Sequence, residues 1–179
     1  MKRLIIYVNL ILAMLTWTVS GLLADGSINP YYRGEVEGTM EQLTEDLKSS
    51  LTESGFDIIG EYNPAGENEL FLIAFTSDDL LKITLKDKDE KALASVLKIG
   101  LMDLKNGKIE VSLLNPTYLF YSYLRHDYEK YEEKLNELQM QTMLAVASAG
   151  IRLLPSSEVS LRVSELKEFR FMVRMPGFD

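Results

Sequence analysis

Asn115-Pro116-Thr117-Tyr118 is the one place where adjacent residues of this chain can build an anion site. A strand end followed by a helix start leaves backbone N–H groups without helical acceptors, and such groups attract a carboxylate or phosphate. Tyr121 and Tyr123 can wall a pocket beside them. Asn is also a preferred helix cap, which would give Asn115 a purely structural role. Both interpretations stay open, and the expected ligand-binding residues are Asn115, Thr117, Tyr118 and Tyr121.

An enzymatic alternative rests on His126, the only histidine, which is followed by Asp127. A histidine held by a carboxylate can act as a general base, with Tyr121 or Tyr123 nearby. Residues adjacent on a helix do not face each other, however, so the pair is not a dyad by sequence alone. A histidine without a catalytic role is the simpler interpretation. We therefore expect a non-catalytic protein, with a periplasmic enzyme using His126 and a tyrosine as the alternative.

A metal or haem carrier is a further alternative. The pairs Met140/Met143 and Met172/Met175 offer thioether sulfur, a ligand for copper(I). Methionine is more often a filler of hydrophobic cores. The chain has no cysteine, which excludes thiol catalysis, zinc–thiolate sites and iron–sulfur clusters. No cofactor is expected, and Met172 and Met175 are the weak candidates for a metal site.

Residues 1–24 have the organisation of a secretory signal peptide. Lys2 and Arg3 precede an apolar run from Leu4 to Val19, and small residues follow. The run is short for a spanning helix, which needs about 20 apolar residues. An uncleaved anchor is the alternative. We expect cleavage after Gly21 or Ala24, an exported, periplasmic location and no membrane span after processing.

The charge of the chain limits its partners. The formal net charge is −8, and loss of the two cations Lys2 and Arg3 with the signal changes it to −10. Nucleic acid needs Lys and Arg against its phosphates, so it is not an expected partner. Apolar residues make up 46% of the chain, enough for a buried core. Residues 25–179 are expected to form a single domain.

Alternating apolar and polar residues predict several strands that would position these side chains. The expected strands are 31–38, 56–62, 69–76 and 108–114. The run Leu70–Phe75 indicates a strand buried on both faces. The stretch 92–104 fits a strand or a helix, and Asn106-Gly107, a strong hairpin signal, favours the strand. Residues 25–30 are interpreted as a loop.

Two main helices are expected. The first runs from a Thr39 cap to a stop at Gly55. The second covers 116–149, with a break near residues 125–127 where Asp127 can cap a new helix. Apolar residues at three- and four-residue spacing along 116–149 indicate packing on the sheet or, alternatively, a homodimer seam. Short elements complete the chain: a helix from Ser77 to about Leu81, one turn at 164–169 and a last strand at 169–175.

Three short blocks of this pattern resemble the domain-of-unknown-function 302 family. They are a helix ending in Gly55-Phe56, the strand Leu72–Phe75, and the strand Val111–Leu114 followed by Asn115-Pro116. The resemblance covers about residues 31–150 and leaves 151–179 as a C-terminal extension. It implies a compact α+β sandwich and no particular activity. Many members have Cys or a small residue before Asn-Pro, where this chain has Leu114, so a thiol role is ruled out.

The sequence thus predicts an α+β fold with a mainly antiparallel sheet of about four to six strands, packed by two main helices as a two-layer sandwich. The expected function is an exported, non-catalytic binding or interaction domain. A small ligand or a protein partner would bind near the Asn115-Pro116 corner.

Overall fold

Alternating side chains and well-placed turn residues build a sheet that positions every candidate site. The computed structural model describes residues 26–66, 69–86, 90–156 and 160–168. Its main sheet has six antiparallel strands in the order β3-β4-β5-β6-β2-β7. These are β3 (Asp57–Tyr62), β4 (Leu70–Thr76), β5 (Leu97–Asp103), β6 (Lys108–Leu114), β2 (Tyr31–Glu37) and β7 (Leu154–Pro155). The predicted antiparallel sheet is confirmed.

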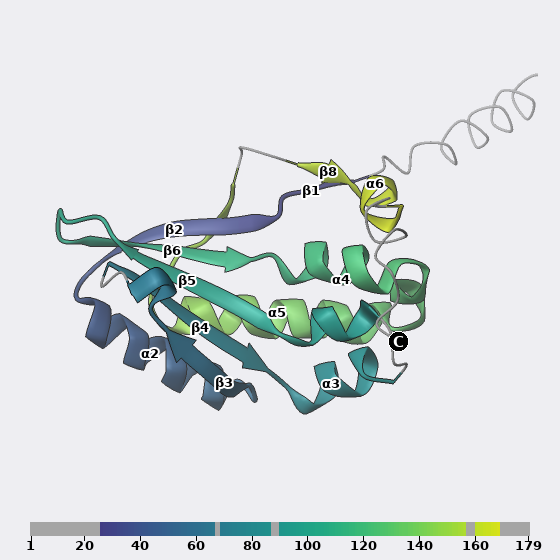
Figure 1. Ribbon diagram of the computed structural model, residues 1–179, viewed down its shortest axis with the longest axis horizontal. Coiled ribbons are helices and arrows are strands. Elements are labelled where there is room, and N and C mark those ends of the chain that lie inside the picture. The colour runs from purple at the N-terminus through teal and green to yellow at the C-terminus, as the bar shows by residue number, and fades with distance from the viewer. Residues whose placement is uncertain (1–25, 67–68, 87–89, 157–159, 169–179) are drawn as a thin grey trace, which may run out of the picture.

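Helices lie on one side of this sheet and beyond one end of it (Figure 1). The helices are α2 (Met40–Glu53), α3 (Asp78–Thr84), α4 (Pro116–Leu124), α5 (Glu132–Ser148) and α6 (Val163–Lys167). Short 3-10 helices are η1 (Pro64–Gly66), η2 (Glu90–Ser95) and η3 (Arg125–Lys130), and a two-stranded sheet pairs β1 (Ser27–Ile28) with β8 (Leu161–Arg162). The two longest helices, α2 and α5, pack against each other and against the sheet. The α+β fold predicted as a two-layer sandwich is therefore confirmed.

The core lies between the helices and the inner face of the sheet. Ile73, Ile99 and Val111 from the three central strands are fully buried. Phe75 of β4 meets Phe56 edge to face, with ring centroids 5.3 Å apart. The helices contribute residues such as Leu47 to the same cluster. Because side chains alternate along a strand, the next residues on each strand point to the opposite, outer face.

The side-chain caps predicted at Thr39, Ser77 and Asn115 are confirmed. Thr39 accepts a hydrogen bond from the Gln42 N–H at the start of α2, and Ser77 accepts one from Leu80 at the start of α3. Gly55, with φ +83°, follows α2 as expected of a helix stop. The helix α3 continues to Thr84, one turn beyond the prediction.

The segment 116–149 differs from its prediction in one respect. It is broken as expected, but Asp127 does not cap the next helix: α5 begins at Glu132 with no side-chain cap. The carboxylate of Asp127 instead pairs with Lys91 and Lys130. Arg125, with φ +50°, marks the break after α4. Buried positions of the predicted seam include Tyr128, Leu135 and Ala145, so the seam packs into the core.

Other predictions fail in smaller ways. The 105–107 turn joins β5 to β6 as predicted, but its positive φ angles fall on Lys105 and Gly107 and not on Asn106. Residues 92–95 belong to η2, so the strand starts only at Leu97. The expected loop 25–30 contains β1. The helical turn predicted at 164–169 is present as α6, and the strand predicted at 169–175 lies outside the described residues.

Candidate functional site

The polar groups of the Asn115-Pro116 corner are hydrogen-bonded within the protein. Asn115 is only 3% exposed. Its side-chain oxygen accepts from the Thr117 N–H at 3.1 Å, and its side-chain nitrogen donates to the Asn29 carbonyl at 2.7 Å. The Asn115 N–H donates to the Pro30 carbonyl, and Gln139 Oε1 also accepts from Thr117. These donors of the predicted anion site are thus bonded within the protein, as in the capping interpretation.

The predicted tyrosines have different surroundings. Tyr121 stacks on Tyr128 with ring centroids 3.9 Å apart, and Lys167 lies over the Tyr121 ring. Tyr118 is half-buried, and burial, together with Tyr31 and Tyr123 nearby, raises the pKa of its hydroxyl. That hydroxyl therefore keeps its proton at neutral pH and can donate a hydrogen bond. Tyr31, which is exposed, is one of the two tyrosines whose charge influences Tyr118.

The histidine is placed away from any assembled catalytic group. His126 is exposed on η3. Its neighbour Asp127 is bound by Lys130 and by Lys91, the latter at 2.7 Å, and these hydrogen bonds lower the pKa of the carboxyl to about 2. Asp127 is thus engaged by lysines and does not orient His126.

The methionine pairs do not come together in the described structure. Met140 is 59% exposed on α5, whereas Met143 packs against the core. Met172 and Met175 lie outside the described residues. Within the described parts of the chain, no three His, Cys, Asp or Glu side chains gather closely enough to hold a metal ion.

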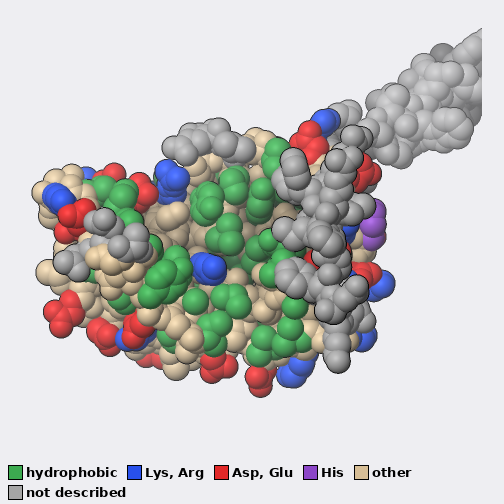
Figure 2. All heavy atoms as spheres, viewed as in Figure 1, with side chains coloured by type: hydrophobic (Ala, Val, Ile, Leu, Met, Phe, Trp, Pro, Cys, Tyr) green, Lys and Arg blue, Asp and Glu red, His purple; other side chains and the backbone are tan. Residues whose placement is uncertain are grey.

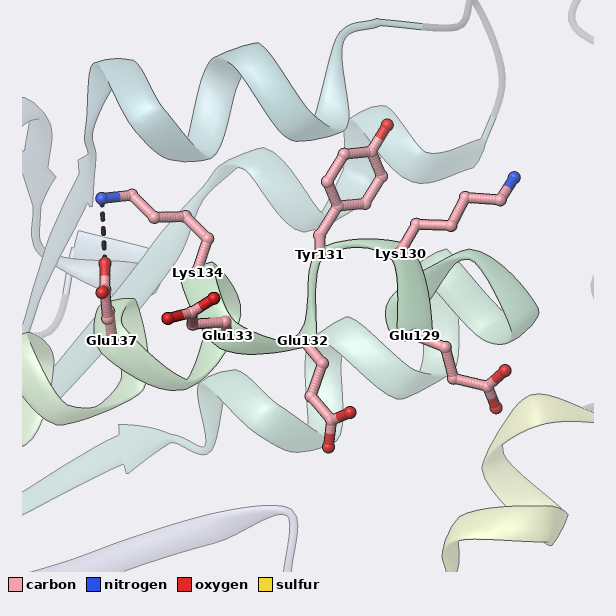
Figure 3. A pocket seen from close by; sticks show the side chains of 7 residues that line it. All are labelled: Glu129, Lys130, Tyr131, Glu132, Glu133, Lys134 and Glu137. Carbon is pink, nitrogen blue, oxygen red and sulfur yellow. Dashed lines mark hydrogen bonds and ion pairs between the residues drawn. The ribbon is translucent and has the colours of Figure 1, made fainter.

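One hollow lies at the junction of η3 and α5 (Figure 3). It has a volume of about 570 Å³ and is lined by residues 129–134 and by Glu137, which are mostly Glu and Lys. Lys134 pairs with Glu137 and with Asp79, and Glu129 pairs with Lys167. Four charged side chains of this hollow, those of Glu129, Lys130, Lys134 and Glu137, are thus engaged in ion pairs with one another or with residues of other elements.

The outer face of the sheet is different, because the long helices α2 and α5 lie on the other side of the sheet (Figure 1) and the short η1, which contacts β4, contributes Pro64 to this face. Figure 2 shows apolar side chains gathered over the middle of this face, with Lys or Arg among them and acidic side chains mainly at the rim. The pairing register places its side chains in cross-strand rows. The central row is Leu154, Arg33, Ser112, Gly100, Leu72 and Tyr62.

A shallow hollow of about 210 Å³ lies in the middle of this outer face. Leu70, Leu72 and Met102 line it, and Gly100 and Ser112 are the small residues among its lining. A methyl group added at Gly100 would meet only the Ser112 carbonyl, at 3.9 Å. Glycine inside a strand often marks a place where a ligand approaches the backbone. The outer face is therefore the candidate site.

Comparison with known proteins adds the fold but no activity. No family model and no curated protein matches the sequence. Among solved structures, the crystal structure of an uncharacterized conserved protein, DUF302, from Bacillus stearothermophilus is similar at 12% identity and a TM-score of 0.56. The similarity covers 67% of this chain and 98% of that one. The chain has a DUF302-like fold.

In this DUF302-like fold, the sequence interpretation missed the outer face for a specific reason. Leu70–Phe75 was predicted to be buried on both sides, but Leu70 and Leu72 remain partly exposed. Whether Leu70 and Leu72 are buried depends on whether another layer packs on their side of the sheet, and the sequence does not show this. Gly100 within a predicted strand was the available signal. No helix of the DUF302-like fold within the described residues is long and apolar enough to cross a membrane.

Proposed function

We propose that this chain is an exported, non-catalytic binding domain that holds a small molecule with an apolar body on the outer face of its sheet. The observation that carries the proposal is an apolar face, away from α2 and α5 in the described part of the chain, with a hollow lined by Gly100 at its centre. The face extends to Tyr31, which pairs with Leu114, so it adjoins the Asn115-Pro116 corner. Exposed apolar surface gathered in one place is typical of binding sites.

The shape of the hollow supports a small ligand. Its volume of about 210 Å³ is below the 300–1,000 Å³ usual for pockets that enclose a drug-sized molecule. A ligand would therefore place one apolar segment in the hollow and lie over the rest of the face. Leu72, Met102 and the Tyr62 ring supply that surface, and each 100 Å² of apolar area removed from water is worth about 2.5 kcal/mol.

The polar side chains of the outer face support a binding role more than a catalytic one. The only histidine, His126, lies on η3 and not on the outer face, and no hydrogen bond between described residues joins Ser112 to Glu110. A nucleophile–base pair needs such a hydrogen bond. Binding alone accounts for the features of this face.

The binding site can be tested with a neutral solvatochromic dye such as Nile red. Its fluorescence should rise on addition of the purified processed protein. Gly100→Val should weaken this binding by at least about tenfold, because the new side chain fills the hollow. Gly26→Val is the matched control, because Gly26 also has open space around it but lies away from the sheet. Equal dye binding by the wild type and Gly100→Val would refute the site.

Export is tested separately. The full chain, expressed in a Gram-negative host, should appear in the periplasmic fraction with an N-terminus at Leu22 or Asp25, as read by mass spectrometry of the intact protein. A product that retains Met1–Gly21 in the membrane or cytoplasmic fraction would contradict the export part of the proposal and leave the binding part in place.

A further inference from the structure

The two ends of the outer face carry opposite charges along the strand direction, and this difference indicates which charge a ligand would have. Toward the hairpin at residues 104–107 it carries Glu35 and Glu110, which are cross-strand partners. Glu35 is paired with Lys108 at 3.0 Å. Toward the Asn115 corner, the same face carries Lys98, Arg33 and Tyr31 instead. One end of the face thus favours an anion, and the middle is apolar.

Lys98 is the main anion-attracting group. It is exposed on β5, directly opposite Ala74 of β4 and two residues from Gly100. No ion pair between described residues includes Lys98, whereas the nearby lysines Lys105 and Lys108 both have glutamate partners. In a chain of net charge −8, a lysine with no acidic partner among the described residues is complementary to an anionic group on a ligand.

Neighbouring groups can complete the recognition of an anion. Arg33 lies on β2, with β6 between it and β5, so the two cations are about 10 Å apart across the strands. The phenol of Tyr31 lies on the same face as Arg33, two residues away. Tyr118 is near enough to Tyr31 for the two to interact electrostatically, and its neutral phenol can donate a hydrogen bond. The corner end of the face therefore carries Lys98, Arg33 and Tyr31.

We infer that the ligand of this face is a free anionic amphiphile, a monocarboxylate with one alkyl chain, whose head lies near Lys98 and Tyr31 and whose chain fills the Gly100 hollow. This inference rests on the proposed function. Lys98 and Met102 are four residues apart on β5, so the apolar path from the head position is about 13 Å long. That length suits a medium-length alkyl chain, and the glutamates disfavour the reverse orientation.

The test compares decanoate with 1-decanol, which share the chain and differ in the charged head. Both should displace Nile red below the micelle concentration. At low salt, decanoate should bind about two- to fivefold more tightly, which is the contribution expected of an exposed ion pair. The preference should shrink as salt is added. Lys98→Gln should abolish the preference and leave decanol binding unchanged.

Two matched variants separate this inference from the proposed function. Lys82→Gln removes the same charge from α3, a helix that is not part of the sheet, and should keep the decanoate preference. Gly100→Val should remove binding of both compounds. Decanol binding that Gly100→Val abolishes, without any preference for decanoate, would overturn the inference and leave the proposed function standing. Failure of the wild type to bind decanol or Nile red would overturn the proposed function itself.

Membrane lipid is the other source of an anionic head on an alkyl chain. Vesicles of phosphatidylglycerol and of phosphatidylcholine distinguish it from a free carboxylate. We expect no sedimentation of the wild type with either vesicle, because a strongly acidic protein is repelled by an anionic surface. Lys98-dependent binding to phosphatidylglycerol vesicles, with no binding of monomeric decanoate, would overturn the inference of a free ligand.

Discussion

The two faces of the sheet come from the same strands but have opposite roles. On β4, Ile73 and Phe75 point into the core and are fully buried, whereas Leu72 points outward and stays partly exposed. On β5, Ile99 is buried and Gly100 lies in the hollow. The comparison shows that one pleated backbone can separate stability from binding, because successive side chains belong to different faces.

Two glycines make the same contrast at single residues. Gly34 on β2 pairs with Val111 and therefore faces inward, where a methyl group would lie 2.3 Å from the Arg152 carbonyl oxygen. Gly100 faces outward into open space. A glycine on the inner face is thus required by close backbone approach, and one on the outer face leaves room for something that is not part of the chain.

The largest expected difference between the faces comes from truncating one side chain on each. Phe75→Ala should lower the free energy of unfolding by about 3–5 kcal/mol, because it removes a buried ring and leaves a cavity. Leu72→Ala, three residues away on the same strand, should cost less than about 1 kcal/mol. Urea unfolding followed by circular dichroism measures both. A Leu72→Ala cost close to that of Phe75→Ala would mean that the outer face is also part of the core.

The glycine pair gives the next largest effect. Gly34→Ala should destabilise the protein by about 1–3 kcal/mol, because the new methyl group and the Arg152 carbonyl must move apart. Gly100→Ala should be neutral or stabilising by up to about 1 kcal/mol, since alanine loses less conformational freedom on folding. Thermal unfolding of the two variants beside the wild type gives the comparison. Equal destabilisation would show that the space at Gly100 is occupied by the protein itself.

Much of the fold was predictable because its signals are local. Thr39 and Gly55 bound α2 through capping and a left-handed backbone, which depend on a few neighbouring residues. The turn 105–107 joins β5 to β6 for the same kind of reason. The start of β5 was misplaced because residues 92–95 have apolar spacing that suits several conformations, and only their packing against α4 makes them helical.

The candidate site was harder to predict, because it depends on which face of the sheet the long helices leave free. Asn115 and Tyr118 are prominent sequence features, yet the Asn115 side chain is fully used within the protein, because its nitrogen donates to the Asn29 carbonyl and its oxygen accepts from the Thr117 N–H. Lys98 and Gly100 have no motif, and their meaning appears only when the register places them beside Leu72 on an uncovered face. The spacing of apolar residues along a strand does not show which face of the sheet the helices cover.

The corner beside the outer face should behave as a structural joint. Asn115→Ala removes the α4 cap and leaves the Asn29 carbonyl without its donor, so we expect a loss of about 1–2 kcal/mol in the free energy of unfolding. Asn115→Asp keeps the acceptor for Thr117 and should lose less. Chemical denaturation of both variants measures these losses. Unchanged stability of Asn115→Ala, with weakened ligand binding, would instead assign Asn115 to the binding site.

The smallest expected difference is in stability, between the loss of the paired carboxylate of Asp127 on the helical side and the loss of the charge of Lys98 on the outer face. Since lysines lower the pKa of Asp127 from 3.8 to about 2, its carboxylate stabilises the fold above pH 3.8, and this stabilisation is lost as the pH falls toward 2. Asp127→Asn should therefore cost less than about 1 kcal/mol at pH 7 and nothing at pH 2. Lys98→Gln should match the wild type at every pH. Urea midpoints between pH 2 and 7 test both variants, and a deficit of Asp127→Asn that persists at pH 2 would show that packing, and not charge, holds Asp127 in place.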